Sequence, residues 1–130
     1  MENRSPQNSL STTGRMSPQG RVACTTSPGL VTITLDGEID LLVTEALDGA
    51  LATAADARPA DVAVDLGGVT FIGSQALSFL VRLHHLTAED GRLTTLHHVP
   101  PMVRKAMVTV GLDLLFPLEE SGISGPRGIE

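Results

Sequence analysis

The chain has 130 residues, a net charge of −6, 42 % hydrophobic residues and three aromatic residues, all of them Phe. This length predicts one domain with an aliphatic core, because a chain of about 100 residues or more buries enough surface to fold without disulfides or metals. The acidic balance disfavours nucleic acid and anionic membranes as partners and suits a basic protein surface, and the shortage of aromatic rings argues against stacking on single-stranded nucleic acid.

Both ends of the chain have compositions that predict disordered tails. Residues 1–20 are rich in Ser, Thr, Pro, Gln and Gly, and residues 121–130 (SGISGPRGIE) are similar; such segments bury too little apolar surface to fold. We therefore expect one domain over residues 21–120, between a disordered N-terminal tail and a flexible C-terminal tail. We expect no signal peptide, and we find no run approaching the ~18 apolar residues of a membrane span.

The single cysteine, Cys24, bears on the cellular compartment. One cysteine excludes an internal disulfide and fits a reducing cytosol, so we expect a cytoplasmic protein. We also expect Cys24 to be a small buried hydrophobic residue, because no Cys-His framework surrounds it.

The domain begins with a pattern that predicts a β-hairpin. Residues 22–26 form a weak strand and residues 27–29 (SPG) a turn. Residues 30–35 alternate apolar and polar side chains, the period of a half-buried strand. Residues 36–40 (DGEID) are polar and predict a loop.

Two amphipathic helices and a buried strand follow. Thr44 can cap the first helix, whose apolar residues recur at helical spacing up to the Arg-Pro pair at residues 58–59. Residues 62–66 form an apolar run typical of a central strand covered on both faces. The second helix opens at Gly73 and Ser74, with one apolar stripe: Ala76, Phe79, Leu80, Leu83 and Leu86. The opposite stripe is polar: Ser78, Arg82, His85 and Glu89.

The last third of the domain predicts a strand, a helix and a short final segment. Residues 93–99 form the strand, and the helix runs from the Pro pair at residues 100–101 to about residue 110, with Gly111 as its C-cap. Residues 112–116 are mostly apolar and form either a last short strand or a segment that docks on the core. Strands separated by helices imply parallel pairing, so the predicted fold class is α/β.

Three segments, taken in order and spacing, resemble one known family. They are residues 35–40 (LDGEID), residues 64–72 (VDLGGVTFI), and residues 101–116, which include TVGLD. The first resembles the Gly-Glu-Leu-Asp segment of STAS domains, the second their Asp-Leu-Ser-x-Val-x-Phe-Ile strand and loop, and the third their last helix with its Thr-Gly-Leu-Asp ending. The resemblance covers roughly residues 22–120 and implies the STAS fold, a mixed, mostly parallel sheet of four to five strands with packed helices.

The same resemblance implies a function in transcription regulation. STAS domains of this kind are bacterial anti-sigma-factor antagonists. They bind an anti-sigma factor, which is a serine kinase of the histidine-kinase-like fold, and so free the sigma factor. In this chain, the resemblance places the partner-binding residues in two segments: Glu38 and Asp40 in the predicted loop, and Gly73, Ser74, Gln75 and Ser78 at the start of the second helix. For Glu38 and Asp40, solvated loop carboxylates remain an equal alternative.

The start of the second helix departs from the family motif. The family usually carries Asp-Ser-Ser-Gly-Leu where residues 73–77 are GSQAL. The second serine is the family's usual phosphoacceptor, and Gln75 in its place is neutral and cannot be phosphorylated. The interpretation is a loss of the phosphoserine switch, with ordinary drift in a still-binding domain as the alternative. Ser74 is expected to act as a helix N-cap, and it is also the candidate phosphosite if the acceptor has shifted by one residue.

No pattern in the sequence indicates catalysis, a metal or a cofactor. The four histidines form two adjacent pairs, whereas helical metal sites prefer spacings of three or four: His84, His85, His97 and His98. No Ser-His-Asp order, paired-carboxylate motif or phosphate-binding loop is present. We therefore predict a non-enzymatic protein-binding module. Two alternatives stay open: a STAS subunit of a larger assembly, such as a lipid-transport or stress-sensing complex, and a small-ligand-binding STAS domain.

Overall fold

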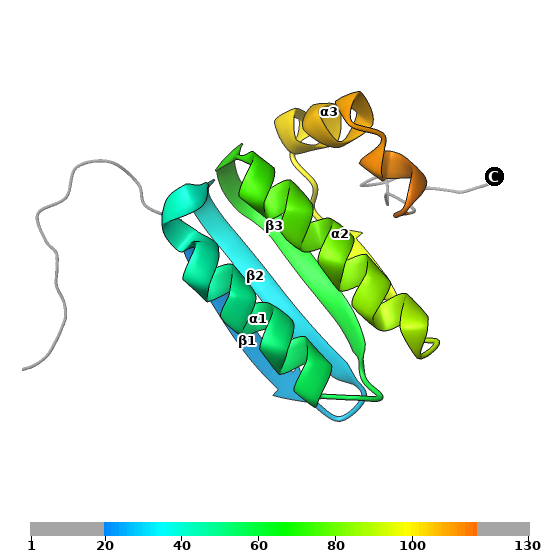
Figure 1. The fold of residues 1–130 in the computed structure, drawn as a ribbon. Helices are drawn as coiled ribbons and strands as arrows, with labels where there is room; N and C mark the ends of the chain where they lie inside the picture. Colours follow the sequence, from blue (N-terminus) through cyan, green and yellow to red (C-terminus); the bar gives the residue numbers. More distant parts are fainter. Residues whose placement is uncertain (1–19, 117–130) are drawn as a thin grey trace, which may run out of the picture.

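The computed structural model describes residues 20–116 and shows a mixed four-stranded sheet with three α-helices in that range (Figure 1). The strand order is β1-β2-β3-β4. β1 (Arg21–Ser27) pairs antiparallel with β2 (Leu30–Ile39), and β3 (Asp61–Ile72) and β4 (Thr94–His97) continue the sheet in parallel. The predicted α/β class and the mostly parallel sheet are confirmed. The predictions for the two tails concern segments outside the described residues, apart from Gly20.

The predicted hairpin is confirmed, but β2 is longer than the sequence indicated. Gly29 adopts a φ of 81° in the turn, a backbone conformation that glycine takes without strain. The predicted loop at residues 36–40 is wrong, because β2 continues to Ile39 and pairs with β3 there, with register shifts around Asp36 and Gly37. The polar side chains suggested a loop, whereas β3 pairs with this backbone and β1 reaches as far as Asp36. Cys24 is exposed on the edge strand β1, so the prediction that it is buried is also wrong.

Helices α1 (Thr44–Asp56) and α2 (Ser74–Glu89) lie next to each other over one face of the sheet (Figure 1). The predicted stripe of α2 is confirmed, since Ala76, Phe79, Leu80 and Leu83 are buried and the opposite stripe is exposed. Below the helices lie the inward-facing residues of β2 and β3: Val31, Ile33, Leu35, Val62, Val64 and Leu66. No helix within residues 20–116 is both long and apolar enough to cross a membrane.

The chain after β4 forms helix α3 (Pro101–Thr109) and a 3-10 turn, η3 (Leu112–Leu114). Gly111 ends α3 in the left-handed conformation with a φ of 81°, as expected for a C-cap glycine. The strand predicted as one option for residues 112–116 does not form. The other option, a segment that docks on the core, is confirmed by the burial of Leu112 and Phe116.

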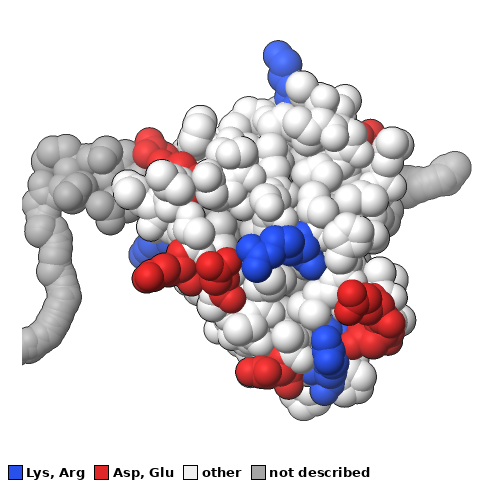
Figure 2. Space-filling view, in the orientation of Figure 1, with Lys and Arg blue, Asp and Glu red and all other residues white. Residues whose placement is uncertain are grey.

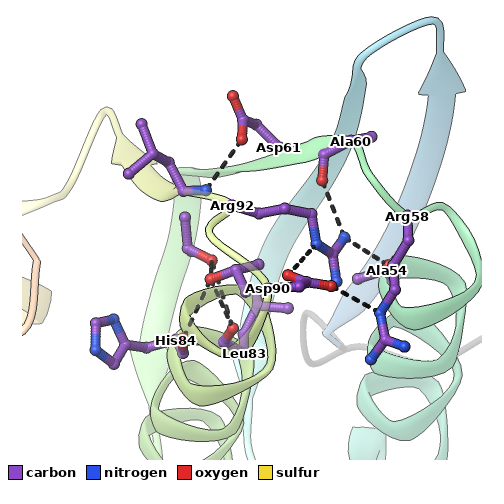
Figure 3. Close-up of polar contacts among 11 residues, drawn as sticks. Ala54, Arg58, Ala60, Asp61, Leu83, His84, Asp90 and Arg92 are labelled. Atoms are coloured by element: carbon purple, nitrogen blue, oxygen red, sulfur yellow. Dashed lines mark hydrogen bonds and ion pairs between the residues drawn. The ribbon is translucent and has the colours of Figure 1, made fainter.

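Buried Arg92 connects the C-terminal end of α1 to the residue before β3 by hydrogen bonds (Figure 3). Nη1 of Arg92 donates to the carbonyl oxygens of Ala54 and Ala60, both at 2.9 Å. Its Nε donates to Asp90 at 2.9 Å, and the other oxygen of Asp90 pairs with Nε of Arg58, also at 2.9 Å. Arg92 is 5 % exposed, so these contacts satisfy carbonyl groups at the helix end away from bulk water.

Candidate functional site

The predicted site residues meet at the end of the sheet where β2 and β3 stop and α2 begins. The backbone N–H of Gly73 donates to the carbonyl of Ile39 at 2.8 Å, which ties the residue between β3 and α2 to the end of β2. A methyl group on Gly73 would lie 3.5 Å from Cα of Asp40 and from the ring of Phe71. The structure therefore makes neighbours of Asp40 and Gly73, which the sequence separates by a strand and a helix.

The start of α2 presents Ser74 and Ser78 to solvent and leaves Gln75 half-buried. The predicted N-cap role of Ser74 is wrong. Gly73 is the N-cap residue, and its carbonyl accepts the backbone N–H groups of Ala76 and Leu77. Ser74 is already the first helical residue, so its hydroxyl does not reach a free amide of the first turn and instead contacts Oε1 of Gln75 at 3.4 Å.

The two predicted carboxylates have different surroundings. Glu38 lies in β2, half-buried, with Phe71 as its partner in the register with β3. Asp40 caps the short 3-10 turn η2 (Leu41–Val43), because its Oδ1 accepts the backbone N–H of Leu42 at 3.0 Å. One oxygen of Asp40 therefore has a structural role within the chain.

Sequence reasoning missed three exposed apolar residues at this end of the molecule. Leu41 is 65 % exposed, Leu42 83 % and Phe71 50 %. Leu41 and Leu42 form η2 just after Asp40, and Phe71 lies beside Gly73. An apolar pair directly after a loop carboxylate was the available signal. The exposure of this leucine pair was not predictable, because large apolar residues are most often buried.

A shallow groove of 310 Å³ runs between α1 and the first turns of α2. Leu47 and Phe79 line it together with six polar residues: Thr44, Asp48, Ser74, Gln75, Ser78 and Arg82. Arg82 and Asp48 bridge the two helices at 3.2 Å. Both side chains are more than half exposed, so this ion pair contributes little to stability.

Charge is unevenly distributed over this end of the chain. Residues 36–48 contain five carboxylates and no Lys or Arg, and residues 67–78 carry no charge. Figure 2 shows acidic groups over the α1 side of this face, with a basic group directly beside them at its centre. The exposed apolar residues are thus bordered by negative charge, which favours a partner surface that carries positive charge.

The remaining titratable groups of residues 20–116 form no metal-binding cluster but include one histidine–carboxylate contact. No three His, Cys, Asp or Glu side chains within residues 20–116 are arranged to hold a metal ion. Nδ1 of His98 lies 3.2 Å from Oδ1 of Asp65. The backbone N–H of Gly67 is the main cause of a lowered pKa of Asp65, and His98 lowers it further. Partial burial raises the pKa of the Cys24 thiol, which keeps it protonated and weakly nucleophilic.

Comparison with protein families gives one match over most of the domain. The family model described as "Mlab, STAS domain" matches residues 23–118. No curated protein matches the chain.

The chain is also similar in structure to solved anti-sigma factor antagonists and to a cell fate determinant. An anti-sigma factor antagonist from Mycobacterium paratuberculosis is 25 % identical with a TM-score of 0.66, over 77 % of this chain and 85 % of that chain. An anti-sigma-factor antagonist (STAS) domain protein from Planctomyces limnophilus is 24 % identical with a TM-score of 0.65, over 73 % and 86 %. The phosphorylated Bacillus cell fate determinant SpoIIAA is 17 % identical with a TM-score of 0.62, over 78 % and 93 %.

Proposed function

The chain belongs to the STAS domain family, and on this premise we propose that it is an anti-sigma factor antagonist. In this proposal it is a non-enzymatic, cytoplasmic bacterial protein that binds a kinase-like anti-sigma factor and so releases a sigma factor for transcription. The antagonist from Mycobacterium paratuberculosis, at 25 % identity, supports this choice of partner class.

One observation carries the proposal: exposed apolar side chains bordered by carboxylates, at the end of the sheet where α2 begins. Leu41, Leu42 and Phe71 are all at least half exposed there. Protein-binding sites are often marked by exposed apolar side chains with polar residues around them. Glu38, Asp40, Gly73, Ser74, Gln75 and Ser78 surround or adjoin this surface and are the proposed partner-binding residues.

We propose further that binding is not controlled by phosphate at the family's usual position. Gln75 has no hydroxyl to accept a phosphoryl group. A phosphate adds nearly two negative charges, which oppose binding when they are desolvated against a partner that offers no Arg or Lys. Without that control, the protein binds constitutively. Ser74 is the exposed hydroxyl next to this position and remains the candidate substitute.

The experiment uses the full chain and each purified histidine-kinase-like anti-sigma factor of the same genome. Calorimetry should give a specific complex with one of them. Incubation of that pair with ATP should leave the intact mass of the wild-type chain unchanged, while Gln75→Ser should gain one phosphate and lose affinity. Absence of binding to every kinase would refute the antagonist function. A phosphate that disappears in Ser74→Ala would refute constitutive binding and identify a shifted switch.

A second candidate function is a permanent STAS subunit of a larger assembly. The same replacement by Gln75 favours it, because a subunit that never dissociates needs no phosphate switch. The description of the matched family model, "Mlab, STAS domain", also does not mention anti-sigma factor antagonists. Purification of the tagged chain from native extract at high salt separates the two functions. A stoichiometric multi-subunit complex without a kinase would favour the permanent subunit.

A further inference from the structure

The turn η2 holds Leu41 and Leu42 in a fixed position at the surface. At one end, the carboxylate of Asp40 accepts the backbone N–H of Leu42 at 3.0 Å. At the other end, the hydroxyl of Thr44 donates to the carbonyl of Leu41 at 2.7 Å. Between them Val43 is buried in the core. Because backbone and neighbours are already ordered, a partner that binds these leucines does not have to order the turn.

The two leucines and Phe71 are exposed at the same end of the molecule, and we name these three residues the dileucine surface. Phe71 pairs in register with Glu38, and Glu38 precedes Asp40 by two residues. The Phe71 ring would lie 3.5 Å from a methyl group added to Gly73. Leu42 is the most exposed of the three. A few fully buried apolar side chains usually supply most of the binding energy of a small interface.

The charges around the dileucine surface restrict its partner. The segment that carries it, residues 36–48, has five carboxylates and no basic residue. Arg82 lies two turns along α2 from Ser74 and is paired with Asp48. Charge complementarity therefore selects a protein surface with an apolar pocket rimmed by Lys or Arg.

We propose that the dileucine surface is the anchor of the partner interface, and that Asp40 is a positioning residue. Leu42 inserts into a basic-rimmed apolar pocket of the partner protein. Asp40 acts by capping η2 through one carboxylate oxygen, and its negative charge is not the essential feature. This inference rests on the proposed function, since it concerns the same partner.

The first test compares two exposed leucines that both lie in 3-10 turns. Leu42→Ser should weaken binding of the purified kinase-like anti-sigma factor about 30-fold, as expected for a buried anchor. Leu114→Ser is the matched control, because Leu114 is 85 % exposed in η3, on the α3 side of the molecule (Figure 1). The control should bind with an affinity within threefold of the wild-type chain. Both variants should have the melting temperature of the wild-type chain.

The second test separates the cap from the charge at Asp40. Asp40→Asn keeps a side-chain oxygen that caps well, whereas Asp40→Ala removes it. Affinity should fall about tenfold in Asp40→Ala and clearly less in Asp40→Asn, which retains the cap. An equal loss in both variants would overturn the positioning role.

The outcomes distinguish this inference from the proposed function. If the wild-type chain binds a kinase and Leu42→Ser binds it as well as Leu114→Ser does, the anchor is refuted and the antagonist function stands. If the wild-type chain binds no kinase, the proposed function is refuted, and the inference fails with it.

Discussion

Replacing Arg92 by Met should strongly destabilise the fold, although the residue lies far from the dileucine surface. The substitution removes three charged hydrogen bonds, one to Asp90 and two to the carbonyls of Ala54 and Ala60, and each of the two carbonyl bonds is worth ~1.5–3 kcal/mol. It also removes Nη2 of Arg92, which is buried without a partner among the described residues. Because an unpaired buried donor costs ~1–3 kcal/mol in the folded state, its removal offsets part of the loss. The apolar stem of Arg92 is replaced by a side chain of similar length. The expected net loss is ~2–4 kcal/mol of unfolding free energy.

The matched control is Arg58→Met, which removes the other arginine that pairs with Asp90. The two ion pairs have the same N–O distance, 2.9 Å, but the Arg58 side chain is 52 % exposed and that of Arg92 only 2 %. An exposed pair contributes ~0–1 kcal/mol, so Arg58→Met should change little. Urea unfolding at pH 7, followed by circular dichroism, measures both. Equal losses in the two variants would refute the assignment of the stabilisation to the buried carbonyl contacts.

Three further predictions concern the core, the response to pH and the tails. Leu80→Ala should cost ~2–5 kcal/mol in the same assay, because Leu80 is fully buried; a loss under ~0.5 kcal/mol, typical of surface sites, would contradict its burial. The pKa of Asp65 is lowered by the N–H of Gly67 and by His98, so this carboxylate stabilises the fold above its unfolded pKa near ~4 and loses that effect as the pH falls. Asp65→Asn should therefore lose less stability than the wild-type chain between pH 5 and pH 2, and parallel curves would exclude this contribution. A chain trimmed to residues 20–120 should keep the melting temperature of the full chain, whereas a fall of several degrees would show that a tail packs on the domain.

The second hairpin strand and α2 were predictable because each has a strong periodic pattern, whereas the apolar run at residues 62–66 indicated only the first half of β3, which continues to Ile72. Val31, Ile33 and Leu35 alternate and are all buried, and the stripe centred on Leu80 recurs at helical spacing. The order and spacing of the motif segments then gave the family. Local patterns of this kind are decided by burial of one face, which is the dominant energetic term in these elements.

The parts that the sequence did not reveal depend on contacts between distant segments. The polar residues 36–38 belong to a strand because β3 pairs with them. Leu42 is exposed in η2, and Gly73 lies beside Asp40 because its N–H bonds to the carbonyl of Ile39, a contact between segments far apart in the sequence. The N-cap of α2 differs from the prediction by one residue, from Ser74 to Gly73, which is the usual uncertainty of a helix boundary.

The position of Arg92 has a consequence for how this protein can diverge. Arg92 bonds to Ala54 near the last turn of α1, whereas Leu41 and Leu42 directly precede its first turn. A helix of 13 residues is about 20 Å long, and substitutions that far apart have nearly additive effects. Substitutions of Leu41 and Leu42 should therefore leave the contribution of Arg92 to stability unchanged, so the surface of η2 can vary between related proteins without weakening the far end of α1.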